Sequence, residues 1–257
     1  MRKILLLNLI TLTFILGCGS KKPLEGNNAQ AMYERAISEL AKDKGGFFGL
    51  FNATDYETIE ETLKEIQIRY TYSPYATLAE LRTADTYFKR GEYAQAAIEY
   101  EEFIRRHPSH NGTEYATFFL GLCNYKLIRG HDRDPKGARE AIKWLNEYVA
   151  QYPDSPLVPK ADKNIRETMD VLAEREIYIG DYYYKKNNYK ASSERYKTVI
   201  DQYPGSKHYA RALYLLGKSY SDMDENDLAL SALNRVINEF PNSKYNKDAS
   251  ELASRIK

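Results

Sequence analysis

The sequence predicts an all-α protein, a superhelix of five helix-turn-helix units with a long joining helix between units three and four. Two observations predict it: a proline after an aromatic residue or a histidine recurs at the end of helical patterns, and small and large side chains recur at fixed distances before it. The prolines are Pro108, Pro153, Pro204 and Pro241. The 257 residues, 43% hydrophobic with a net charge of +1, have the composition of an ordinary folded chain.

The spacing within the repeat is identical in three units. Small residues stand 24 and 12 positions before Pro108, Pro204 and Pro241, an aromatic residue follows the first small residue by three positions, and a large residue precedes the proline by eight. The strings are Ala84, Tyr87, Ala96 and Tyr100; Gly180, Tyr183, Ser192 and Tyr196; and Gly217, Tyr220, Ala229 and Leu233. This order resembles the tetratricopeptide repeat of about 34 residues, in which small residues let two antiparallel helices approach and large ones fill the groove beside them.

The first unit is less regular. We expect Ala36 and Leu40 on its first helix, and Thr71 occupies the position of the proline. The second helix carries Tyr56, Ile59, Leu63 and Ile66. Between the helices, the glycine- and phenylalanine-rich stretch 45–51 lengthens the turn. That stretch either packs back onto the solenoid or forms part of a contact surface.

The third unit has an enlarged turn. From Gly121 to Pro153 it spans 32 residues, and the surplus of eight falls in the stretch 129–135. The joining helix follows, from Pro159 to Glu176, and leads to the fourth unit. Serines next to the prolines are expected to cap the starts of the following helices. They are Ser73, Ser155, Ser206 and Ser243.

The first 17 residues have the pattern of an export signal, a basic start and then an apolar run from 4 to 16 that is too short and polar to span a membrane. Ile15-Leu16-Gly17-Cys18 resembles the lipobox of bacterial lipoproteins, which are cleaved before an acylated cysteine, here between Gly17 and Cys18. The alternative is an ordinary secretory signal with a chance cysteine. Gly19-Ser20 after the cysteine favours the outer membrane. The predicted domains are the signal 1–17, an acylated cysteine and flexible tether 18–30, and the solenoid 31–257.

Several classes of chemistry are not expected. The near-balance of 37 basic and 36 acidic residues argues against nucleic-acid binding. The four histidines form no zinc-binding pattern, so we expect neither a metal nor a cofactor. Cys123, on the inner face of a helix, is expected to be a small core residue rather than a nucleophile. The 23 tyrosines are unusually many, and at repeat positions we expect their rings to seal neighbouring helices with the hydroxyl at the rim.

Beyond the repeat, nearly the whole chain is similar to the BamD family, lipoproteins of the outer-membrane β-barrel assembly machinery. The similarity includes the lipobox and the enlarged third turn. Its strings are Phe103-Ile104-Arg105-Arg106-His107-Pro108-Ser109-His110, Ser73-Pro74-Tyr75-Ala76, Asp132-Arg133-Asp134-Pro135, Leu172-Ala173-Glu174-Arg175-Glu176 and Tyr182-Tyr183. The departures are Thr71 and the stretch 45–51, both at the N-terminal end.

This resemblance implies a non-enzymatic periplasmic scaffold, lipid-anchored in the outer membrane. Its implied partners are the periplasmic domain of the barrel-forming subunit, accessory assembly lipoproteins and unfolded outer-membrane proteins. The family pattern of a tyrosine pair followed by an arginine implies that Tyr182, Tyr183 and Arg195 contact the barrel-forming subunit. Tyr75 is the expected substrate-sensing residue, and its alternative interpretation is a tyrosine that packs between units.

Two other functions stay open from the residues alone. One is another envelope repeat lipoprotein, such as a pilus or secretin assembly factor or a cell-envelope coordinator. The other is an enzyme hidden within the solenoid, which the lack of any catalytic motif disfavours.

Overall fold

Consecutive α-helices build the part of the chain that the computed structural model describes, residues 26, 28–42, 54–128, 130 and 135–256. The chain divides into two compact units, residues 1–76 and 77–257, and no strand occurs in the described ranges. The all-α prediction is confirmed. None of the described helices is both long and apolar enough to span a bilayer.

The first compact unit holds α1 (Ala29–Ala41) and α2 (Tyr56–Arg69), and α3 (Pro74–Arg90) begins at its end. The helices α1 and α2 pack together through the apolar residues that the sequence predicts. The buried ones are Met32, Ala36, Leu40, Ile59, Leu63 and Ile66. The stretch 45–51 and the segment 1–25, which includes Gly17 and Cys18, lie outside the described residues.

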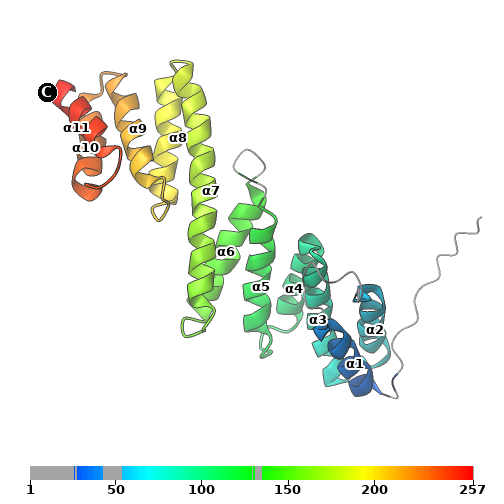
Figure 1. Cartoon of the computed structure of the whole chain (residues 1–257). Coiled ribbons are helices and arrows are strands. Elements are labelled where there is room, and N and C mark those ends of the chain that lie inside the picture. The colour runs from blue at the N-terminus through cyan, green and yellow to red at the C-terminus, as the bar shows by residue number, and fades with distance from the viewer. Residues whose placement is uncertain (1–25, 27, 43–53, 129, 131–134, 257) are drawn as a thin grey trace, which may run out of the picture. The chain divides into compact units, whose positions relative to one another are not determined.

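In the described part of the second compact unit, the rest of α3 is followed by eight further helices (Figure 1). They are α4 (Tyr93–Arg106), α5 (Thr113–Lys126), α6 (Lys136–Gln151), α7 (Val158–Lys185), α8 (Tyr189–Gln202), α9 (Tyr209–Ser221), α10 (Asn226–Glu239) and α11 (Asn246–Ile256). From α4 onward each helix packs against the next along the chain. This stacking of consecutive helical pairs is the arrangement that the repeat spacing predicts.

The helix crossings explain the small residues of the repeat. A Cβ atom added to Gly180 would lie 2.5 Å from Cε1 of Tyr196, and one added to Gly217 would lie 2.7 Å from Cγ of Leu233. In the third unit, Gly121 meets Leu145 in the same way. The backbone of the first helix therefore lies directly on a large side chain of the second, as predicted.

The turns between units share one hydrogen bond that begins the next helix. In each, the residue two positions after the proline, or after Thr71 in the first turn, accepts a hydrogen bond from the backbone N–H of the residue two positions further on. The pairs are Ser73 and Tyr75, His110 and Gly112, Ser155 and Leu157, Ser206 and His208, and Ser243 and Tyr245. The acceptor in the second of these turns is Nδ1 of His110 at 2.9 Å, a role that the sequence did not reveal.

The predicted capping positions were partly wrong. Ser155, Ser206 and Ser243 stand three residues before the helices α7, α9 and α11 begin, so they initiate a preceding turn rather than act as N-caps. Each also accepts the N–H of the first helical residue at its carbonyl oxygen. Their hydroxyl groups therefore stabilise the turn that precedes the helix, and not the first turn of the helix itself.

The joining helix is longer than predicted. Helix α7 has 28 residues and continues past Glu176 to Lys185, so the joining helix and the first helix of the fourth unit are one element (Figure 1). No glycine or proline stands between Pro159 and Gly180, and Gly180 itself is needed for the crossing with Tyr196. At the C-terminal end, α11 follows the fifth unit and covers its core with Ala249 and Ala253.

Candidate partner-binding site

The strongest candidate for a binding site lies in the fourth unit, where the family pattern places Arg195. This arginine is on α8, and its Nη1 atom donates to Oε2 of Glu176 at 3.1 Å. The Glu176 side chain is only 7% exposed, whereas the Arg195 side chain is 43% exposed. Arg195 thus has one end on a buried carboxylate and enough exposed surface to meet a partner.

Glu176 has a second basic neighbour. Nη1 of Arg175 lies 3.5 Å from Oε1 of Glu176, so the two carboxylate oxygens face two different arginines. A buried carboxylate needs a partner, because moving an unpaired charge from water into the protein interior costs on the order of several kcal/mol. Burial raises the pKa of Tyr203, and the nearby Glu176 carboxylate raises it further. The Glu176 carboxylate therefore lies between two guanidinium groups.

The tyrosine pair is on the last turn of α7. Tyr182 is 59% exposed, Tyr183 is half-buried, and their rings meet edge to face with centroids 5.6 Å apart. One turn earlier, Tyr178 is also exposed, so the outer face of α7 carries two tyrosine rings in succession. Neither Tyr182 nor Tyr183 hydrogen-bonds or stacks with Arg195 in the described ranges. The structure thus places the three predicted residues on adjacent helices without joining them directly.

Tyr75 belongs to the first compact unit. Its ring lies 5.5 Å from that of Tyr33 on α1, with the two planes at 52°. The residue is partly buried. This contact agrees with the alternative interpretation of Tyr75 as a packing residue. Part of the residue remains accessible to solvent.

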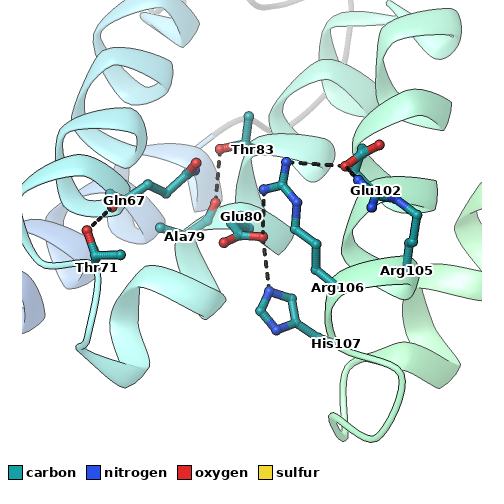
Figure 2. Close-up of polar contacts among 9 residues, drawn as sticks. All are labelled: Gln67, Thr71, Ala79, Glu80, Thr83, Glu102, Arg105, Arg106 and His107. Carbon is teal, nitrogen blue, oxygen red and sulfur yellow. Dashed lines mark hydrogen bonds and ion pairs between the residues drawn. The ribbon is translucent and has the colours of Figure 1, made fainter.

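Histidine and cysteine serve structural roles where they are described. Nε2 of His107 lies 3.0 Å from Oε2 of Glu80, which also faces Arg106 at 3.5 Å (Figure 2). Cys123 is fully buried, and burial, reinforced by the Asp85 carboxylate, raises its thiol pKa to about 12. The core role predicted for Cys123 is confirmed. Among the described residues, no three His, Cys, Asp or Glu side chains are grouped as metal ligands.

The repeat pattern did not predict a groove of about 820 Å³ between α4, α5 and α6. Its walls include Ala97, Leu120 and Trp144, with Glu101 and Lys143 at the charged margin. Trp144 is the only tryptophan of the chain and falls at none of the spaced repeat positions. Its rarity was the only sequence signal that pointed to this face.

Comparison with known proteins gives matches along nearly the whole chain. The outer membrane protein assembly factor BamD of Neisseria gonorrhoeae is 26% identical over 258 residues, covering 95% of this chain and 94% of the relative. The protein of the same name from Rickettsia prowazekii is 28% identical over 246 residues, covering 94% and 93%.

A solved structure, the TPR2AB domain of yeast Sti1 in complex with pHSP90, is similar with a TM-score of 0.40 and 14% identity, covering 88% of this chain and 83% of that one. A score this low adds nothing to the fold assignment, which the helix pairing supports by itself. The family described as outer membrane lipoprotein, YfiO, matches residues 27–232. The chain therefore belongs to this family of outer membrane lipoproteins.

Proposed function

We propose that the chain is a non-enzymatic scaffold subunit of the outer-membrane β-barrel assembly machinery. In this role it binds unfolded outer-membrane proteins and docks on the periplasmic domain of the barrel-forming subunit, alongside accessory lipoproteins. The observation that carries the proposal is the similarity to proteins named as outer membrane assembly factors over 95% of the chain. A stack of helical pairs supports it, because such solenoids offer extended binding surfaces.

The proposed docking site is centred on Arg195, with Tyr182 and Tyr183. A guanidinium group can bind a carboxylate of the partner through two parallel hydrogen bonds, and Arg and Tyr are enriched among residues that dominate binding energy. In this chain Arg195 would hold Glu176 through Nη1 while its exposed part meets the partner. The buried Glu176 would then be connected to the partner through the Arg195 side chain.

The test compares two arginines that share Glu176. In the full chain purified from membranes, Arg195→Gln should weaken binding to the barrel subunit's periplasmic domain by about tenfold or more, the effect of losing a dominant interface residue. Arg175→Gln removes the other basic neighbour of Glu176 and should leave the affinity within about twofold, as for a non-interface position. Circular dichroism checks that both variants fold. Equal losses in the two variants would mean that Arg195 acts only by neutralising Glu176.

The proposed substrate role of Tyr75 has its own matched pair. Tyr75→Ala and Tyr33→Ala each remove the same ring contact. If Tyr75 senses substrate, only Tyr75→Ala should weaken the binding of a C-terminal peptide from an outer-membrane protein. Equal effects of the two variants would support the packing interpretation and remove Tyr75 from the substrate site.

We also propose that the chain is cut after Gly17 and acylated at Cys18, which would place it on the periplasmic face of the outer membrane. Several acyl chains hold a protein far more firmly than one, because each buried CH₂ contributes about 0.8 kcal/mol. Cys18→Ser should therefore abolish lipid attachment, as read from the intact mass and from membrane fractionation. A mass that differs only by the exchange of sulfur for oxygen, with no loss of acyl chains, would show that the export signal is an ordinary secretory one.

A further inference from the structure

The turn between α7 and α8 carries a concentrated positive charge. Lys185 and Lys186 end α7, and Lys190 lies in the first turn of α8. All three residues are exposed, and within the described ranges none of them forms an ion pair. No acidic residue occurs in the stretch 182–190. Within its own residues this turn is therefore basic, on a chain whose overall charge is nearly zero.

Two tyrosines belong to the same turn as the three lysines. The rings of Tyr184 and Tyr189 are tilted at 57° with centroids 5.2 Å apart, and the Tyr189 hydroxyl donates to Oδ1 of Asn187 at 3.1 Å. Asn187 adopts a left-handed conformation with φ of 57°, which fixes the tight turn. The three lysines thus share their turn with a pair of contacting tyrosine rings. Tyrosine rings and long basic side chains together are typical of protein surfaces that meet the boundary between water and lipid.

Acidic residues bound this surface on one side. The next helical hairpin turn, between α9 and α10, carries Asp222, Asp224, Glu225 and Asp227, all exposed. The two turns lie side by side, because the Tyr184 hydroxyl donates to Asp222 and Lys218 lies over the Tyr184 ring. The basic surface therefore consists of the α7–α8 turn alone.

From this charge and composition we propose that Lys185, Lys186 and Lys190 contact the anionic phospholipid headgroups of the membrane to which the chain is attached. Anionic lipids attract exposed lysines near the surface, and the attraction acts within about a Debye length of roughly 10 Å at 0.1 M salt. The chain belongs to a family of outer membrane lipoproteins, and the acylation proposed for Cys18, on which this inference rests, would hold it close to that surface. The contact is additional to the proposed docking through Arg195 and orients the fourth unit toward the bilayer.

The experiment measures how close this turn comes to lipid. The acylated full chain carries Glu194→Cys, an exposed position one turn after Lys190, labelled with a fluorescent dye, while Cys123 is buried and unreactive. The protein is inserted into phosphatidylcholine vesicles with or without phosphatidylglycerol, each containing a lipid with a nitroxide on its headgroup. We expect quenching about threefold stronger with phosphatidylglycerol, and a fall when the salt is raised to about 0.5 M.

Three variants make the result specific. Lys185→Gln, Lys186→Gln and Lys190→Gln together should reduce the quenching to the level of the neutral vesicles. The same charge change at Lys143, Lys160 and Lys163, exposed lysines elsewhere in the second compact unit, should leave it unchanged. Asp224→Asn, Glu225→Gln and Asp227→Asn together should increase it, because they remove the neighbouring negative charge.

Three outcomes would overturn the proposal. One is equal quenching in anionic and neutral vesicles, and another is an equal loss in the control lysine variant. The third is quenching that requires an added acidic protein instead of anionic lipid, which would assign the basic turn to a protein partner.

Discussion

The Tyr100 hydroxyl donates a hydrogen bond of 2.6 Å to Oδ1 of Asp85, and both residues are buried between α3 and α4. The fourth unit repeats the bond fifteen residues apart, from Tyr196 to Asp181 at 2.8 Å. Tyr115 also donates to Asp85, at 3.0 Å, and Arg82 pairs with its other oxygen. A buried carboxylate thus links the two helices of the second unit to the start of the third.

Tyr100→Phe should destabilise the chain, because the substitution removes a hydrogen bond to a charged and buried acceptor. The expected loss in the free energy of unfolding is about 1.5–3 kcal/mol. Urea unfolding followed by circular dichroism measures it. Tyr93→Phe, at a partly buried position on α4 where the ring meets Phe88, is the control and should change little.

The helix crossing in the fourth unit predicts that Gly180→Ala is harmful. Its new Cβ would lie 2.5 Å from Cε1 of Tyr196, which is fully buried and has no room to move. Overpacking of this kind costs about 1–3 kcal/mol. In Gly137→Ala the closest atom to the Cβ is 3.6 Å away, so that control should keep or raise stability. Equal thermal unfolding of the two variants would contradict the crossing.

Left-handed residues recur at one turn position and predict stabilising substitutions. Gly91, Asn187 and Asp224 each stand seven residues after the small residue of their unit and have φ values of 80°, 57° and 59°. Glycine adopts this conformation without the steric cost that other residues meet. Asp224→Gly should therefore raise or preserve the melting temperature, whereas Gly91→Ala should lower stability by about 1 kcal/mol. A loss of stability in both variants would argue against the turn geometry.

The free energy of unfolding should decrease in mild acid because His208 becomes protonated. Burial lowers the pKa of its imidazole below the usual 6.5, and its Nε2 atom is buried with no hydrogen-bond partner in the described ranges. The unfolded chain therefore binds a proton at His208 more readily than the folded chain, so this contribution is complete above pH 6.5 and is lost as the pH falls below it. His208→Gln should make the free energy of unfolding less dependent on pH between 8 and 5. An unchanged dependence would exclude His208 as its source.

Cys123 should be unreactive in the folded protein. With a pKa of about 12 and no exposed surface, its thiol is neither ionised nor accessible at pH 8. In a Cys18→Ser chain, where it is the only cysteine, a thiol reagent should react fully only after denaturation. Rapid reaction in the native state would show that α5 is not buried as described.

The sequence predicted the helical pairs because small and large residues must alternate where two helices cross, as Gly217 and Leu233 do. It did not predict that α7 is continuous. The repeat pattern marks the positions where two helices cross, and it does not show whether two successive helices are joined into one. The predicted placement of tyrosine hydroxyls at the rim was wrong for Tyr100, which is fully buried on Asp85. That acceptor lies fifteen residues away, so only the fold brings it close.

The candidate site was less accessible to sequence reasoning. The pattern singled out Arg195 but not its buried partner Glu176, because the two are brought together by the packing of α8 on α7. Likewise, the acceptor role of His110 depends on the backbone of its turn, where four other turns use serine. Short-range spacing identifies the helices, while the pairing of charges depends on how those helices pack.

The most direct measurement of the proposed function is purification of the tagged chain from native membranes, followed by mass spectrometry. The assembly-scaffold proposal predicts that the barrel-forming subunit co-purifies in stoichiometric amount, together with accessory lipoproteins, and that Arg195→Gln reduces its recovery while Arg175→Gln does not. Recovery of secretin, pilus or peptidoglycan-synthesis proteins in place of the barrel-forming subunit would contradict it.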